Sequence, residues 1–402
     1  MTSKILIAAA SVSLLFAANA MAADAPKPPP MSNAMAKALT EAQKAETAKD
    51  FPAALKAIDK AKAVSSPTPY DTLMMNRVAM DIYIRMNDLA NAEVYAVAAA
   101  ETDPSAIPDA DKASVYKPAV QLAVNAKHAD KAVKFSKLWL AATPPPTGGD
   151  LELVTSALYN GGDMAGAAAL AQKNIDAAIA AGKKPVLSDL QILRNAQVAQ
   201  NDQPGAEKTL EMQVASYDKP QDWALILSVA MTTRGMRDID YVYLGRLMLQ
   251  QARPIAASDA QLVGTTANKM ALYGDAEAMQ KAGGPPADAR EVADKKSVPA
   301  QITAGAKANG EYNVKLAEVL YGYGMYPEAI AAAQLSKTKG GASDPNEADM
   351  VIAMTQSATG QYAAANATFA GIKATSPATA RVVRLWGYFT KLKASPATAA
   401  AQ

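Results

Sequence analysis

Few residues in this chain have the types and spacing that could do chemistry. Its 402 residues include no cysteine and a single histidine, His128. The lack of cysteine excludes disulfides, thiolate metal sites and cysteine nucleophiles, and one histidine is too few for a multi-histidine metal site. His128 stands between Lys127 and Asp130, in a predicted turn between helices. We therefore expect an exposed turn residue and not a catalytic base.

Carboxylate pairs are the second possible source of chemistry. Asp238 lies near Asp240 and Glu311 near Glu318, but the chain has 38 acidic residues, so such pairs arise by chance in helices. A glycosidase needs two acids at a defined separation, and sequence spacing does not establish it. The acids alone do not indicate an enzyme.

A glycine motif gives the third candidate. Gly322-x-Gly324 resembles the start of a dinucleotide-binding fingerprint, but Pro327 stands where the third glycine is required and no strand precedes it. No P-loop, G-x-S-x-G or H-E-x-x-H sequence occurs. We predict no enzymatic activity, no cofactor and no metal.

The charges nearly cancel, with 40 Lys and Arg against 38 Asp and Glu. A balance of this kind gives no general field that would attract nucleic acid or an anionic membrane. Nucleic acid is therefore not an expected partner.

The N-terminus has the pattern of an export signal. Lys4 precedes an apolar run from Ile5 to Ala18, and Ala20-Met21-Ala22 is typical of a cleavage site. We predict a signal peptide over 1–22, with an uncleaved anchor helix as the alternative, and a Pro-rich leader over 23–32. No later apolar run reaches the roughly 18 residues of a membrane span. The predicted location is the bacterial periplasm or cell envelope.

The rest of the chain alternates helical stretches with short turns. Successive turns lie roughly 34 to 40 residues apart, a period typical of paired-helix solenoids. Gly283-Gly-Pro-Pro286 and the polar stretch that follows interrupt this rhythm. We therefore predict a helical array over 33–282, an irregular joint over 283–300, a second array with a last helix over 301–393, and a disordered tail over 394–402.

The clearest pair is Leu316–Ser336, with a turn at Gly324 and with Pro327 opening the second helix. In these residues the chain resembles the tetratricopeptide repeat family, whose motif has small residues where paired helices cross and aromatics between pairs. The matching positions are Leu316, Ala317, Gly324, Tyr326, Ala329, Ala353, Gly360, Tyr362, Ala365, Phe369 and Pro377, and near the start Ala42, Phe51, Ala54, Ile58, Tyr83, Ala92, Ala99 and Pro104.

The motif is weak over 150–280, where another helix-pair repeat stays possible, and Trp223–Arg253 fits poorly. The last helix, Ala378–Lys393, has one apolar face and one basic face, and the basic face includes Arg381 and Arg384. This pattern predicts a capping helix, with membrane-surface binding or docking as alternatives. The expected fold is all-α, a superhelical solenoid of such pairs.

The resemblance implies that the first helices of the pairs line a concave surface where partners bind. Arg77, Asp81 and Arg85 are spaced four apart, on one face of a predicted helix. Neighbouring first helices add Lys117, Gln121, Gln191 and Asn195. Arginines and amides suit an extended peptide or a carboxylate, whereas the alternative interpretation is a solvated helix face.

These patterns predict an exported, non-enzymatic scaffold that binds a protein or peptide. Two alternatives stay open. One is an enzyme, or an accessory subunit of one, acting on envelope polymers such as peptidoglycan or glycan. The other is a structural protein that self-associates through tyrosines and the helix containing Trp386.

Overall fold

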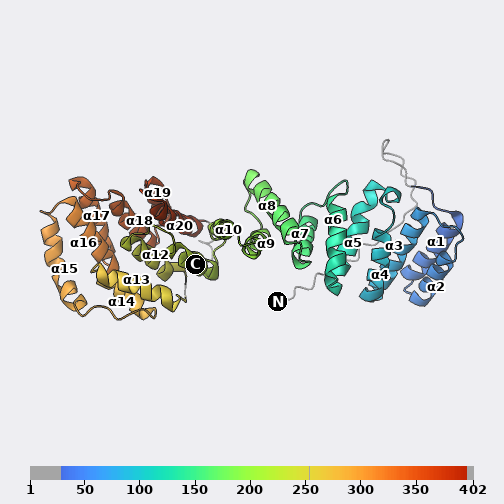
Figure 1. Ribbon diagram of the computed structural model, residues 1–402, viewed down its shortest axis with the longest axis horizontal. Helices are drawn as coiled ribbons and strands as arrows, with labels where there is room; N and C mark the ends of the chain where they lie inside the picture. The colour runs from blue at the N-terminus through green and yellow to red at the C-terminus, as the bar shows by residue number, and fades with distance from the viewer. Residues whose placement is uncertain (1–28, 253, 396–402) are drawn as a thin grey trace. The chain divides into compact units, whose positions relative to one another are not determined.

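The computed structural model describes residues 29–252 and 254–395. Over these residues the chain is all-α, with twenty α-helices, one short 3-10 helix and no strand (Figure 1). The predicted signal peptide, most of the leader and the end of the tail lie outside the described residues. No helix among the described residues is long and apolar enough to cross a membrane.

The contacts divide the chain into two compact units, which we call unit 1 (residues up to Gln200) and unit 2 (from Asn201). The helices of unit 1 are α1 Asn33–Thr47, α2 Phe51–Lys62, α3 Pro69–Arg85, α4 Leu89–Ala100, α5 Asp109–Ala126, α6 Ala129–Leu140, α7 Gly149–Asn160, α8 Met164–Ala180 and α9 Leu187–Ala199, with the 3-10 helix η1 at Pro104–Ala106.

The helices of unit 2 are α10 Gln203–Ser216, α11 Pro220–Met231, α12 Asp238–Gln251, α13 Ala257–Lys269, α14 Tyr273–Lys281, α15 Glu291–Gly305, α16 Gly310–Gly322, α17 Tyr326–Lys339, α18 Asn346–Ala358, α19 Tyr362–Gly371 and α20 Pro377–Lys393.

Short turns with a shared design join the helix pairs of unit 1. In three of them an aspartate side chain accepts a hydrogen bond from the backbone N–H three residues later and so caps the second helix: Asp50, Asp88 and Asp163. The residue before each aspartate has the left-handed backbone that reverses the chain: Lys49, Asn87 and Gly162. The chain can therefore start each second helix directly after the first one ends.

Consecutive helices of unit 1 pack as pairs, α1 with α2, α3 with α4, α5 with α6 and α7 with α8. The first helices also contact one another, as α1 does with α3, α5 with α7 and α7 with α9. Small residues at the predicted crossing positions are buried, among them Ala42, Ala54, Ala92 and Ala99. The all-α fold of tetratricopeptide-like helix pairs is confirmed.

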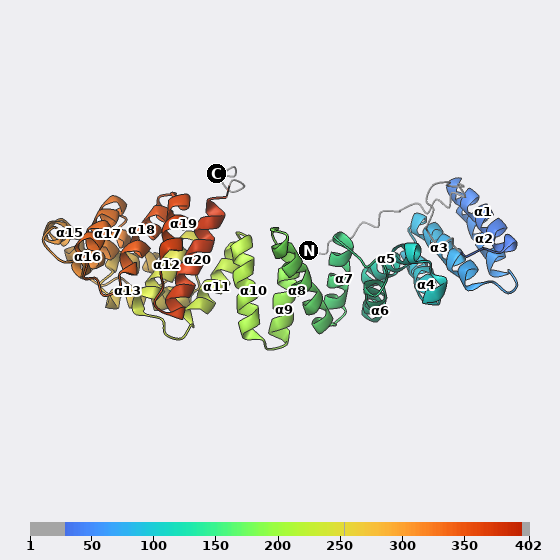
Figure 2. The ribbon, with the colours of Figure 1, turned by 90° about the horizontal axis from the view of Figure 1, so that it is seen from above.

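Unit 2 continues with pairs, but its helices also close on themselves. Helix α12 packs on α14, α14 on α16, α16 on α18, α18 on α20, and α20 on α12. We call these five helices the ring. Helices α13, α17 and α19 pack outside it, each against two neighbours in the ring. In Figure 2 the last helix, α20, lies beside both α19 and α12.

The last helix therefore does more than cap the array. Trp386 is fully buried, and its indole N–H donates to the Tyr243 carbonyl of α12 at 3.1 Å. On the basic face, Arg381 and Arg384 both bond to Glu211 of α10. Part of the basic face is thus covered, because Arg381 is buried against Glu207 and Glu211, whereas Arg384 keeps 43% of its side chain exposed.

The stretch expected as an irregular joint, 283–300, contains most of helix α15. Only Val298 and Gly305 of this helix are buried. It lacks an apolar stripe, so its sequence has no helical periodicity to detect. Pro299 also lies inside this helix.

Gly274 lies in the first turn of α14, and the turn before this helix has Ala271 in the left-handed conformation, with φ of 57°. A Cβ on Gly274 would lie 2.4 Å from the Gly322 carbonyl carbon and oxygen. Gly274 and Gly322 thus allow the backbones of α14 and α16 to come into direct contact. Of these two glycines and Gly324, it is Gly324, with φ of 73°, that lies in a turn.

Candidate functional site

The residues predicted to line a partner-binding face lie on the first helices of unit 1. Arg77, Asp81 and Arg85 belong to α3, Lys117 and Gln121 to α5, and Gln191 and Asn195 to α9. Asn195 and Arg85 are exposed, and Asp81, Lys117, Gln121 and Gln191 are half-buried. We call these residues, with their neighbours on α7, the first-helix face.

Polar pairs connect neighbouring first helices along this face. Arg85 forms an ion pair with Glu46 of α1. Lys117 lies 2.7 Å from Asp150 of α7. The Asn195 amide donates to the Tyr159 hydroxyl of α7 at 3.3 Å. Side chains that were predicted to bind a partner protein thus also join consecutive helix pairs. The spacing of residues within a single helix could not predict these contacts between helices.

Arg77 is 6% exposed and does not lie on an open surface. Its guanidinium forms an ion pair with Asp111 of α5 at 3.3 Å and donates to the Ser114 hydroxyl at 3.1 Å. Its expected outward direction was wrong, because α5 covers this part of α3. For the remaining residues of the face, partner binding stays a prediction.

His128 is half exposed at the start of α6, with Nδ1 2.6 Å from a Glu93 carboxylate oxygen. Lys131 contacts the same oxygen at 3.1 Å. The carboxylate of Glu93 is 5% exposed, so His128 and Lys131 cover a buried acid. Within the described residues, no group of three or more His, Asp or Glu side chains could hold a metal ion.

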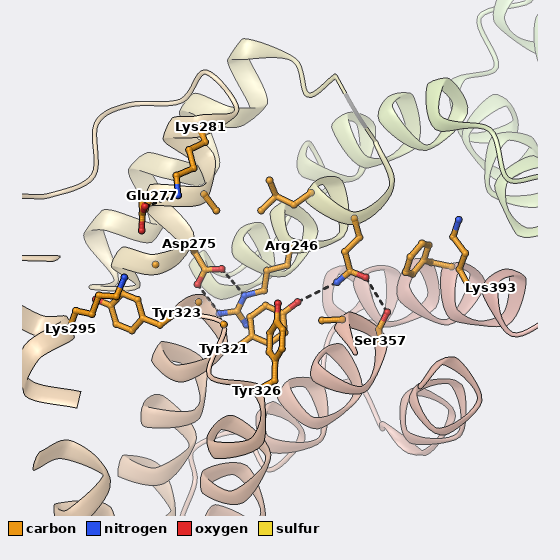
Figure 3. A pocket seen from close by; sticks show the side chains of 18 of the residues that line it. Arg246, Asp275, Glu277, Lys281, Lys295, Tyr321, Tyr323, Tyr326, Ser357 and Lys393 are labelled. Carbon is orange, nitrogen blue, oxygen red and sulfur yellow. Dashed lines mark hydrogen bonds and ion pairs between the residues drawn. The ribbon is translucent and has the colours of Figure 1, made fainter. Parts of the chain in front are cut away.

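The largest concave site is in unit 2, at one end of the ring. The C-terminal parts of α12, α16, α18 and α20 meet there with α14, around a cavity of about 780 Å³ (Figure 3). We call it the ring cavity. Its polar and aromatic lining residues are Arg246, Gln250, Asp275, Glu277, Lys281, Lys295, Tyr321, Tyr323, Tyr326, Ser357, Tyr362, Phe389 and Lys393.

Arg246 forms the floor of this cavity and holds three ring helices together. Its guanidinium donates two bonds to the Asp275 carboxylate of α14, at 2.9 and 2.8 Å, and bonds a Glu318 carboxylate oxygen of α16 at 2.5 Å. The other oxygen of Glu318 accepts from the Tyr243 hydroxyl at 2.6 Å. All four side chains are buried. The cluster therefore satisfies its charges internally, as a buried ion group must.

Burial and ion pairing shift the pKa values of the charged groups in this cluster in opposite directions. Burial raises the pKa of the Glu318 carboxyl, and the Arg246 charge only partly offsets the rise. Burial alone would lower the pKa of Arg246, but Asp275 and Glu318 raise it well above its ordinary value. Arg246 thus stays charged while its carboxylate partners share one cation.

Tyrosines form the wall beside Arg246. The guanidinium carbon lies 4.1 Å from the centre of the Tyr321 ring, and the ring of Tyr326 is 5.6 Å from that of Tyr321. The Tyr321 hydroxyl accepts from the Gln250 amide at 3.3 Å, and Gln250 accepts from the Ser357 hydroxyl at 3.2 Å. Helices α12, α16 and α18 are joined by these bonds at the cavity.

Three lysines reach the cavity from different sides in Figure 3. Lys281 forms an ion pair with Glu277 at 2.6 Å, and Lys393 with Asp218 at 2.6 Å. The Lys295 amine lies over the Tyr323 ring, 5.5 Å from its centre. Among the described residues no carboxylate lies within ion-pair distance of Lys295. The pKa of Glu277 is lowered first by its hydrogen bond to Lys281 and further by the charges of Lys281 and Lys295, so the Lys295 amine also lies in the field of this carboxylate.

Sequence reasoning did not find this site. Tyr321, Gly322 and Gly324 stood out only as parts of a repeat, and Glu318 only as a chance carboxylate. The signal that pointed to it was the poor fit of Trp223–Arg253 to the repeat motif. That segment includes all of α12, the ring helix that packs against α20 and supplies Arg246.

No known protein-family profile matches this chain, and no curated protein does. Among solved structures, a crystal structure of yeast Tom70 is 10% identical, with a TM-score of 0.26, over 91% of this chain and 98% of that chain. A structure of Naa15/Naa10 bound to HypK-THB is 10% identical, with a TM-score of 0.23, over 85% of this chain and 69% of that chain. Since both scores are low, the fold class rests on the helix pairs described above.

Proposed function

We propose that this protein is an exported, non-enzymatic scaffold of the bacterial periplasm or cell envelope, and that the first-helix face of unit 1 binds a protein or peptide partner. The supporting observation is that polar side chains lie on α5, α7 and α9, which pack in succession, and on α3, whose Arg77 forms an ion pair with Asp111 of α5. Arg85, Lys117 and Asp150 keep between 35% and 43% of their side chains exposed.

These exposed side chains can bind the amides and carboxylates of an extended peptide without a change in their own conformation. The helices hold them in position, so little conformational entropy is lost when a partner binds. The pairs between neighbouring helices also fix the spacing of the donors. Binding would therefore depend on the exposed members of the pairs, and Arg77 would contribute only by holding α3 against α5.

A pull-down from an envelope fraction tests this surface. The bait is the exported chain with Arg85, Lys117 and Asn195 all replaced by serine. A matched bait has exposed lysines of the second helices α2 and α8 changed, Lys56→Ser with Lys173→Ser. We expect the first bait to lose a partner that the wild-type and matched baits retain. Retention of every partner by the first bait would contradict the proposal.

Export is tested separately. The mature chain is expected in the fraction released by osmotic shock, with a mass that corresponds to cleavage near Ala23. A cytoplasmic chain that retains residues 1–22 would contradict export.

The enzymatic alternative is tested by incubating the pure protein with peptidoglycan, and release of soluble fragments would support that alternative instead. Light scattering tests self-association, for which the buried Trp386 offers no surface.

A further inference from the structure

We propose that the ring cavity of unit 2 binds a sugar that carries an anionic group, a carboxylate or a phosphate. This site is separate from the first-helix face of unit 1 and does not depend on protein binding there. At about 780 Å³ the cavity lies within the range of sites for small organic ligands, and it is too large for a single ion.

The charge of the lining favours an anion. Four cationic side chains line the cavity, and three of them are paired: Arg246 with Asp275 and Glu318, Lys281 with Glu277, and Lys393 with Asp218. The lining cation outside an ion pair is Lys295. Because Lys295 forms no ion pair among the described residues, its amine is the group best placed to bind a carboxylate or phosphate through a charge-assisted hydrogen bond.

The aromatic residues favour a ring-shaped ligand. Aromatics make up 6% of the chain, yet four tyrosines and Phe389 are among the nineteen residues that line this cavity. A tyrosine offers an apolar ring face together with a hydroxyl that both donates and accepts. A sugar has the same combination, with apolar C–H faces and a rim of hydroxyls.

The polar groups also favour a sugar over a peptide. Ser357, Gln250 and the tyrosine hydroxyls can each donate and accept, as sugar hydroxyls do. Two recurring modes of peptide recognition use a sheet edge or an apolar groove that holds a helix, whereas acidic motifs are bound by clusters of cationic side chains. The ring cavity is a polar pocket closed below by the buried Arg246 cluster, so the acidic-peptide mode is the one that must be tested against a sugar.

Calorimetric titration of the full chain tests the proposal with five probes: trigalacturonate, glucose 6-phosphate, neutral maltotriose, inorganic phosphate and the acidic peptide triglutamate. We expect binding of trigalacturonate or glucose 6-phosphate, and whichever binds tells whether the anion is a carboxylate or a phosphate. Maltotriose and inorganic phosphate each lack half of the required chemistry and should bind at least about tenfold more weakly. Binding of triglutamate as tight as that of the sugars would identify an acidic-peptide site and overturn the proposal.

Paired variants locate the binding. Lys295→Gln should weaken the anionic sugar about fivefold or more, whereas Lys296→Gln, an exposed neighbour outside the cavity, should leave it unchanged. Tyr326→Leu should weaken it about tenfold, and Tyr312→Leu should not. Circular dichroism establishes that each variant is folded. Absence of sugar binding by wild-type protein, or equal loss in Lys295→Gln and Lys296→Gln, would overturn the proposal.

Discussion

The two units of this chain use polar side chains to join helices in different ways. In unit 1 each pair connects one helix to one other: Arg85 with Glu46 and Lys117 with Asp150 have partly exposed side chains, whereas Arg77 is buried in its pair with Asp111. In unit 2, Arg246 alone connects α12 to both α14 and α16, and it is buried. The first unit is therefore held by successive neighbour contacts, whereas the second closes on itself around a charged centre.

This difference has a consequence for stability. In a linear stack, stability is close to a sum of repeat terms and neighbour terms, so that a loss at one end stays local. In a closed ring each helix has two ring neighbours, and removal of one exposes both. We therefore expect unit 1 to respond gradually to damage and unit 2 to respond as a whole.

Removal of a terminal element should give the largest contrast. A chain ending after Ser376 lacks α20 and with it Val382, Leu385, Trp386 and Phe389, all buried. Their burial stabilises unit 2 by at least about 6 kcal/mol, so α10, α12 and α18 should lose hydrogen-exchange protection together.

Deletion of residues 31–66, which removes α1 and α2, is the matched change in unit 1. Loss of protection should be confined to α3 and α4, with α5 to α9 unaffected. Loss of protection throughout unit 1, or continued protection of α12 without α20, would contradict the contrast between stack and ring.

Replacement of a single arginine in each unit should give the next largest contrast. Arg246→Met leaves the buried carboxylates of Asp275 and Glu318 without a cation, at a cost of about 3–5 kcal/mol. Arg85→Met breaks a partly exposed pair with Glu46 and should cost at most about 1 kcal/mol. Urea unfolding followed by tryptophan fluorescence measures both, since Trp223 and Trp386 report on unit 2 and Trp139 on unit 1. Similar losses for the two variants would show that the cluster does not hold the ring.

A methyl group can test the close contact in the ring without changing charge. Gly274→Ala places a Cβ against the Gly322 backbone at 2.4 Å, which neither helix can relieve by moving a side chain. We expect a loss of about 1–3 kcal/mol in unit 2.

Gly387→Ala is the control, because a Cβ there meets nothing within 4 Å and the position is inside α20. It should stabilise by about 0.5–1 kcal/mol. Thermal unfolding measures both changes. If both substitutions were destabilising, the space around each glycine would not explain the effect of replacing it.

The sequence predicted what depends on neighbouring residues. Helix pairs and turn residues such as Gly324 depend on residues close together in the sequence, so their patterns predicted them, as in Leu316–Ser336, where the structure has α16 and α17. The ring was not readable, because the contacts of Trp386 with Tyr243 and of Arg381 with Glu211 join residues 143 and 170 positions apart. Arg246 likewise looked like any helical arginine, since nothing in its neighbourhood along the chain shows that it is buried.

Acidification should give the smallest difference in stability between the two units. In unit 1 the effect comes from one aspartate, Asp71. Asp71 is buried, and its carboxylate accepts from the backbone N–H groups of Ser32 at 2.9 Å and Thr68 at 3.1 Å. Burial alone would raise the pKa of Asp71, but these hydrogen bonds lower it below its ordinary value of 3.8. Because the folded state favours the charged form, this stabilisation is present above pH 3.8 and is lost as the pH falls through the lower folded pKa.

Asp71→Asn removes this ionisable group and should reduce the loss of stability of unit 1 at low pH. The melting temperature of unit 1 should fall less between pH 5 and pH 3 in the variant than in the wild type, by about 3 °C. Asp59→Asn, at an exposed position of α2, should leave the slope unchanged.

Burial raises the pKa of Glu318, so this carboxyl contributes more to the stability of folded unit 2 as the pH falls, in the opposite direction to Asp71. Asp71 of unit 1 and Glu318 of unit 2 should therefore contribute to the acid response with opposite signs, and equal slopes in wild type and Asp71→Asn would refute the role of Asp71.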